Sequence, residues 1–155
     1  MKRGKPDSVG RPEQPLVNPY HVNPHPCSSC PYAKSTPPGV WAEHEYEKLR
    51  RFDEGYQFIP EMSTFLCHQT TVTGVDTLCR GWLTVHRETP ACRILAMSGH
   101  ISWDELYREP VVELYESGAA AADAGQAAIK KPGTRAKKMV KRLMTKGIGL
   151  KERDQ

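Results

Sequence analysis

Four cysteines constrain the fold of this 155-residue chain more than any other feature of its sequence. Cys27 and Cys30 form a C-x-x-C pair, and Cys67 and Cys79 follow much later, which gives the spacing C-x2-C-x36-C-x11-C. A two-residue gap lets both sulfurs of the pair turn toward one ion, as in a zinc knuckle. The other two thiolates would arrive from distant segments, so a single metal ion would tie three parts of the chain together.

The composition indicates that the fold needs such a staple. Only 38% of the residues are hydrophobic, and the mean hydropathy is −0.61. A compact part of about 90 residues would bury only about 60–70% of its unfolded surface. Structural zinc contributes about 10–16 kcal/mol in finger peptides, which rivals the whole stability of an ordinary domain, about 5–15 kcal/mol. We therefore expect a thin core that depends on a metal.

The predicted metal ligands are the sulfurs of Cys27, Cys30, Cys67 and Cys79. His68, next to Cys67, either binds the metal in place of one sulfur or contacts a ligand without binding the metal itself. Dispersed cysteines favour zinc, whereas a close pair followed by Pro31, with two scattered cysteines, also suits a [4Fe-4S] cluster. Without a metal, the four cysteines would pack as small hydrophobic residues, as we expect for Cys92.

Two enzyme classes share the C-x-x-C motif, and both are disfavoured here. Zinc nucleoside deaminases need an upstream H-x-E or C-x-E for a ligand and a proton-shuttling glutamate, but only HVN and HPC precede the pair. In thiol oxidoreductases the motif follows a buried strand, whereas here it follows HVNPHP. No Walker A, G-x-G-x-x-G or G-x-S-x-G sequence occurs. The sequence therefore offers no catalytic residue and favours a non-enzymatic protein.

Local patterns predict a small α+β fold, mostly helical with a short sheet, stapled by the metal. Apolar spacing predicts helices over 38–54 and 77–86, a short helix over 92–98, and a strand over 58–69. The stretch Ser102-Trp103-Asp104-Glu105 is a capping box and predicts a two-turn helix that ends before Pro110.

Changes in composition divide the chain into four parts. Residues 1–25 form a proline-rich flexible lead-in, because proline removes a backbone donor and disfavours helix before it. Residues 26–116 form the cysteine-rich metal-binding domain, and 117–133 form an alanine-rich linker with little to bury. Residues 134–155 form a basic tail helix.

The expected location is the cytoplasm. No apolar run approaches the roughly 18 residues needed to span a bilayer, and no apolar stretch follows the basic N-terminus as in a secretory signal. An odd number of cysteines, five, also argues against a secreted disulfide framework.

The C-terminal part carries most of the positive charge. Residues 127–155 hold ten Lys or Arg and two Asp or Glu, a net charge of +8, whereas the rest of the chain carries −4. Within 134–146 an apolar stripe alternates with basic residues, Thr134 can act as N-cap, and Gly147 can follow the C-terminus. The predicted binding residues are Lys130, Lys131, Arg135, Lys137, Lys138, Lys141, Arg142 and Lys146.

Three roles are open for this tail. The helix can dock on the body, bind nucleic-acid phosphates, or bind a protein groove or an anionic membrane surface. It contains no aromatic residue, so any nucleic-acid binding is expected to act through the backbone rather than through base stacking.

These motifs together resemble an uncharacterised family from actinobacteria and their phages, with the pattern Cys-x-x-Cys-Pro, Gly-Val-Trp, Glu-Tyr-x-Lys-Leu, Cys-His and Cys-x-Gly-Trp. The matching residues are 27–31, 39–41, 45–49, 67–68 and 79–82. The resemblance implies that the four cysteines and His68 form one site, and it implies no activity. The chain is only faintly similar to the WhiB-like iron–sulfur regulators, in which the order of the motifs differs.

The sequence therefore predicts a non-enzymatic, metal-binding adaptor or regulatory protein that contacts nucleic acid or a nucleic-acid-associated protein through its basic tail. One alternative is an iron–sulfur protein that senses redox state or a gas. The other is a structural protein-interaction domain that does not bind nucleic acid.

Overall fold

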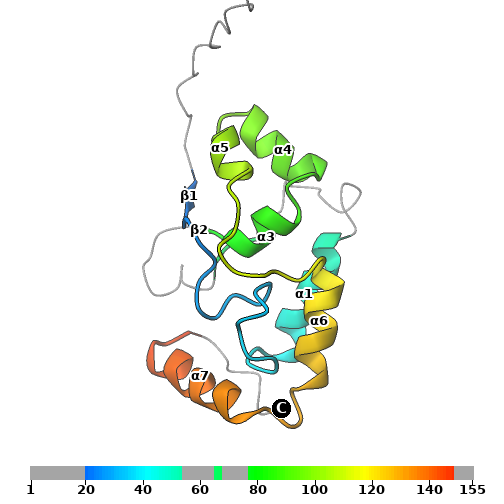
Figure 1. Cartoon of the computed structure of the whole chain (residues 1–155), viewed down its shortest axis with the longest axis vertical. Coiled ribbons are helices and arrows are strands. Elements are labelled where there is room, and N and C mark those ends of the chain that lie inside the picture. The colour runs from blue at the N-terminus through cyan, green and yellow to red at the C-terminus, as the bar shows by residue number, and fades with distance from the viewer. Residues whose placement is uncertain (1–19, 54–64, 68–76, 149–155) are drawn as a thin grey trace, which may run out of the picture.

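A computed structural model describes residues 20–53, 65–67 and 77–148. Within them, short strands and helices follow in the order β1 (His21–Val22), α1 (Glu43–Asp53), β2 (Thr77–Leu78), α3 (Arg80–Val85), α4 (Pro90–Met97), α5 (Trp103–Leu106), α6 (Gly118–Ala127) and α7 (Thr134–Thr145). Helices α4 and α5 lie at one end of the molecule and α7 at the other (Figure 1). The predicted small α+β fold, mostly helical with a short sheet, is confirmed.

The sheet joins the lead-in to the segment before α3. Strands β1 and β2 are parallel, with His21 opposite Thr77 and Val22 opposite Leu78. On its other side, β2 forms an antiparallel bridge from Leu78 to Leu66. The predicted strand over 58–69 is described only at residues 65–67, where this bridge lies. The pairing places the chain around Cys67 beside the start of α3.

Several helix boundaries differ from those predicted from the sequence. The helix predicted over 77–86 begins at Arg80, because residues 77–78 pair with β1 as a strand. Helix α1 begins at Glu43, inside the predicted range 38–54. Helix α5 has one turn rather than two, although Ser102 caps it as predicted, with its Oγ accepting from the Glu105 N–H at 3.1 Å.

The alanine-rich segment expected as a linker contains α6, which packs side by side with α1 (Figure 1). Helix α6 buries only small residues, Gly118, Ala121, Ala122 and Gly125. A Cβ atom on Gly125 would lie 2.0 Å from the ring of Tyr46, so the absence of side chains lets the two helices approach closely. The segment has little apolar bulk, but its small size makes it a good packing surface.

The core runs through the centre of the molecule and reaches α7. Trp41 and Trp82 are among its largest fully buried side chains. Ala136, Met139 and Leu143 of α7 belong to the same cluster, so the basic tail helix docks on the body. Within the described ranges, no helix is both long and apolar enough to pass through a bilayer.

Candidate metal centre

The four predicted ligands come from three separate segments of the fold. Cys27 and Cys30 lie in the loop between β1 and α1, Cys67 follows the bridge to β2, and Cys79 is the N-cap of α3. Cys27 is half-buried, and the other three are buried, with at most 6% of their surface exposed. All five cysteines of the chain are thiols rather than disulfides.

The four sulfur atoms form two contacting pairs. The Sγ atoms of Cys30 and Cys79 lie 4.0 Å apart. The side chain of Cys67 hydrogen-bonds that of Cys27, and Cys27 in turn acts electrostatically on Cys79. Among the described residues, no three or more Cys, His, Asp or Glu side chains are arranged to hold a metal ion as they stand. His68 lies outside the described residues.

Backbone hydrogen bonds set the positions of these sulfurs. The Cys30 N–H donates to the Cys27 carbonyl at 3.0 Å, which closes the turn of the C-x-x-C pair. The Cys67 N–H donates to the Thr77 carbonyl, and the Cys79 N–H donates to the Phe65 carbonyl at 2.8 Å. This exchange holds Cys67 and Cys79 on adjacent chain segments.

Gly81 allows α3 to reach the C-x-x-C loop. A Cβ atom at this position would lie 2.5 Å from the Cys30 sulfur and 2.8 Å from the Tyr32 Cβ. Gly81 falls inside the helix predicted over 77–86, and no role in the site is predicted for it from the sequence. A glycine inside an otherwise helical pattern, two residues after Cys79, indicates that another segment approaches the helix backbone closely at this point.

Two thiols of the cluster have pKa values shifted in opposite directions. The hydrogen bond from Cys67, aided by Ser29, lowers the pKa of Cys27 to about 6, although burial opposes this shift. The hydrogen bond with Cys30, together with burial and the charge of Cys30, raises the pKa of Cys79 well above its ordinary value. The buried cluster thus accommodates one thiolate readily and resists a second, a conflict that a bound divalent cation would remove.

Cys92 lies in α4 and takes no part in these contacts. It is fully buried, and burial raises its pKa to about 11. Its environment is that of an ordinary core thiol, as expected from the sequence.

Two further buried polar residues adjoin the cluster and were not identified from the sequence. The Tyr32 ring packs edge-on against the rings of Phe65 and His86. His86 bridges two elements, since its Nδ1 lies 3.1 Å from the Trp82 carbonyl and its Nε2 lies 2.8 Å from the Asp53 carboxylate. No short sequence pattern marks either residue.

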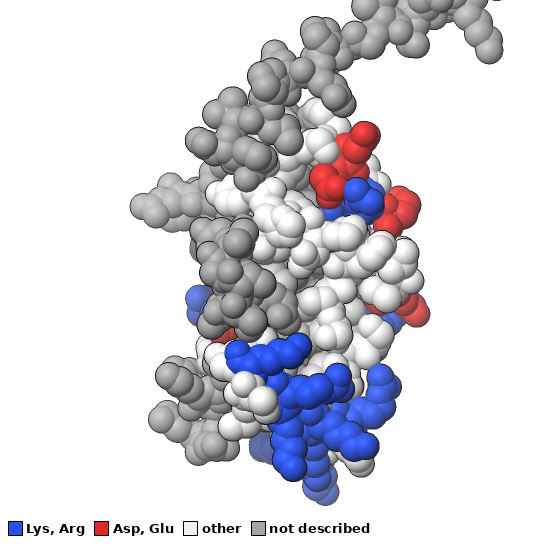
Figure 2. All heavy atoms as spheres, turned by 90° about the vertical axis from the view of Figure 1, so that its left-hand side faces the viewer, with Lys and Arg blue, Asp and Glu red and all other residues white. Residues whose placement is uncertain are grey.

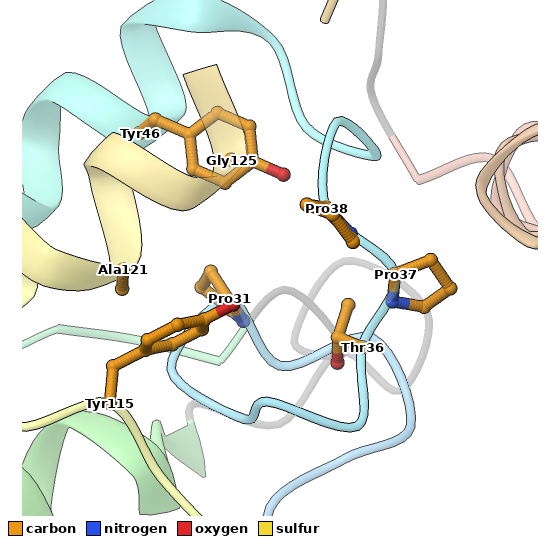
Figure 3. A pocket seen from close by; sticks show the side chains of 8 residues that line it. All are labelled: Pro31, Thr36, Pro37, Pro38, Tyr46, Tyr115, Ala121 and Gly125. Atoms are coloured by element: carbon orange, nitrogen blue, oxygen red, sulfur yellow. The ribbon is translucent and has the colours of Figure 1, made fainter. Parts of the chain in front are cut away.

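A small hollow lies between the loop after Cys30 and helices α1 and α6. The side chains of Tyr46 and Tyr115 and the surrounding prolines face it (Figure 3). Its volume of about 10 Å³ holds roughly one water molecule, whereas small-molecule pockets measure about 300–1,000 Å³. This hollow is therefore too small for a cofactor or substrate.

The predicted basic residues gather at the end of the molecule formed by α7 (Figure 2). All of them are exposed: Lys130, Lys131, Arg135, Lys137, Lys138, Lys141, Arg142 and Lys146. The N-cap position is Gly133, which provides no side-chain cap, rather than the predicted Thr134. Gly147 follows the helix with a φ of +71°, as predicted.

The model of a family of unknown function, DUF6283, matches residues 22–143. The chain belongs to this family. The matched range includes all four clustered cysteines and extends through the alanine-rich segment into α7, so the family spans the body and most of the tail helix. No curated protein and no solved structure matches the chain. The expectation of an uncharacterised family is confirmed.

Proposed function

We propose that this protein binds one zinc ion through Cys27, Cys30, Cys67 and Cys79, and that it is a non-enzymatic adaptor or regulatory protein held together by this ion. The observation that carries the proposal is the 4.0 Å separation of the Cys30 and Cys79 sulfurs, which are 49 residues apart in the sequence. In this proposal Cys27 and Cys67, whose side chains hydrogen-bond each other, are the two remaining ligands.

The sulfur separation favours a single ion over a cluster. At a Zn–S distance of about 2.3 Å, two ligands of a tetrahedral zinc lie about 3.8 Å apart. In a [4Fe-4S] cluster each cysteine binds a different iron, so the cysteine sulfurs are held farther apart than two ligands of the same ion. The Cys30–Cys79 pair therefore needs almost no movement to bind one zinc.

The burial of the site favours a structural role. Cys30 is 1% and Cys79 is 3% exposed, and Trp82 next to them is also buried. Structural zinc sites are closed by four protein ligands, whereas catalytic zinc keeps a position for water. A closed, buried site of four thiolates stabilises the fold and leaves no place for a substrate.

Metal analysis of the full chain tests this proposal. Protein purified under reducing conditions should contain one zinc per chain, and its cobalt-substituted form should show the visible bands of a tetrahedral thiolate site. Cys30→Ser should lose most of the metal. Cys92→Ser is the matched control, because it removes an equally buried thiol outside the cluster, and it should keep the zinc.

Three results would overturn the proposal. They are wild-type protein without zinc, a Cys30→Ser variant that binds zinc as tightly as the wild type, and a brown protein with a broad visible band after anaerobic purification. The last result would establish the iron–sulfur alternative.

A further inference from the structure

We infer that the outward face of α7 is a binding surface for the phosphate backbone of double-stranded DNA. This face is defined by Lys137, Lys138, Lys141 and Arg142. The inference goes beyond metal binding and uses none of the proposed ligands.

The fold itself sets the orientation of this face. Ala136, Met139 and Leu143 are buried against the body and occupy one side of the helix. With 3.6 residues per turn, positions 137, 138, 141 and 142 point to the opposite side. A hydrogen bond from the Arg135 guanidinium to the Ser35 carbonyl at 3.4 Å adds a polar contact between the helix and the body. The four charges are therefore presented together on a docked helix.

Carboxylates of the described residues do not pair with these charges. Residues 124–148 contain no Asp or Glu, and within the described ranges none of the four basic side chains forms an ion pair. Several basic residues elsewhere behave differently, since Lys48, Arg87 and Arg108 each pair with a carboxylate. Figure 2 shows the resulting concentration of positive charge at this end of the molecule.

The geometry favours a nucleic-acid duplex over a membrane. A helix that binds a lipid surface buries its apolar face in the headgroup region, but here that face is already buried in the protein core. Apart from the side chain of Met144, which is 60% exposed, the exposed side of the helix is a row of charges about 18 Å long. Duplex DNA carries one negative charge per roughly 1.7 Å of its axis, so several phosphates come within reach of the row.

The outward face of α7 also lacks the aromatic side chains on which the bases of single-stranded nucleic acid stack. Proteins that bind single-stranded nucleic acid stack bases on aromatic side chains, and residues 124–148 contain no aromatic residue. Contacts to phosphates alone carry no sequence information, so we expect binding without sequence preference.

Fluorescence anisotropy with a short labelled DNA duplex of arbitrary sequence tests the inference on the full, metal-loaded chain. For four phosphate contacts, the logarithm of the association constant should fall against the logarithm of salt concentration with a slope of about −3.6. Lys138→Glu/Lys141→Glu should reduce the magnitude of that slope by about 1.8 and weaken binding roughly 50-fold at about 0.1 M salt. The same duplex should bind more tightly than the corresponding single strand.

A matched control separates the face from overall charge. Arg51→Glu/Arg93→Glu makes the same change in net charge at exposed positions of α1 and α4, and it should leave affinity within about twofold of the wild type. Lys137→Gln/Arg142→Gln tests the same face without charge reversal and should also weaken binding. Circular dichroism and zinc content of every variant show whether fold and metal are retained, so a failure of the zinc proposal remains distinguishable from a failure of this one.

The inference is overturned if the wild type does not bind the duplex at low salt, or if the control loses as much affinity as the α7 variants. It is also overturned if anionic phospholipid vesicles are bound and the duplex is not.

Discussion

Beside the cysteine pairs, Gly81 has no side chain at the point where α3 passes the sulfur of Cys30. The residues around it have little freedom to move. Tyr32 is fully buried, and its ring lies 5.9 Å from that of Phe65 and 5.7 Å from that of His86, measured between centroids. A methyl group at position 81 would therefore push directly on the Cys30 sulfur, at a separation of 2.5 Å.

We predict that Gly81→Ala lowers both zinc affinity and stability. Helix propensity alone would stabilise the variant by up to about 1 kcal/mol, but overpacking should destabilise it by about 1–3 kcal/mol. Zinc competition with a chromophoric chelator and thermal unfolding measure the two effects. Gly133→Ala is the steric control, because a Cβ there meets nothing within 4 Å, and it should keep wild-type zinc affinity. Unchanged zinc affinity in Gly81→Ala would contradict the prediction.

Helices α1 and α6 form the helix pair with the most extensive contact in the described structure. The hydroxyl of Tyr46 on α1 accepts from the backbone N–H groups of Gly39 at 3.1 Å and Trp41 at 3.3 Å, which holds its ring in place. The ring lies against Gly125 of α6. At the other end of the pair, the Asp53 carboxylate accepts from the Gly118 N–H at 2.7 Å and from the Ala119 N–H at 2.6 Å, so α1 caps α6.

Replacing Gly125 with alanine distinguishes local propensity from packing. As an isolated helix position, Gly125→Ala should stabilise the protein by about 1 kcal/mol. In the folded protein the new Cβ would lie 2.0 Å from a ring that is held by two hydrogen bonds, so we expect destabilisation by about 1–3 kcal/mol. The free energy of unfolding of the variant, measured with urea, decides between stabilisation and destabilisation. A higher stability than the wild type would show that packing against α1 does not govern α6.

The loop between β1 and α1, which carries Cys27 and Cys30, also contacts α7. The Ala33 N–H donates to the Cys30 carbonyl, and the Thr36 N–H donates to the Ala33 carbonyl, each at about 3 Å. The Thr36 hydroxyl donates a hydrogen bond to the Ser28 carbonyl at 3.2 Å. The carbonyl of Ser35, in the same loop, accepts from Arg135 of α7. Consecutive turns thus connect the proposed zinc ligands to the basic helix.

We therefore predict that removing zinc affects both stability and DNA binding. If zinc contributes several kcal/mol, a chelator under reducing conditions should lower the melting temperature by at least about 10 °C. Chelation should also weaken duplex binding, because the loop that contacts α7 loses its fixed conformation. Differential scanning calorimetry and anisotropy before and after chelation, with zinc added back as the control, measure both effects. A melting temperature that does not change on chelation would show that zinc does not stabilise the fold.

Features that depend on neighbours within a few turns could be predicted from the amino-acid sequence alone. Ser102 caps α5 because its hydroxyl reaches a backbone N–H three residues ahead, and the stripe of Ala136, Met139 and Leu143 follows from the helical period. Which distant groups meet could be seen only in the folded chain. Residues 77–78 are a strand because β1 pairs with them, and Cys30 faces Cys79 because Gly81 lets α3 come close. Caps and periods act along one stretch of chain, whereas these contacts depend on segments that approach only when the whole fold has formed.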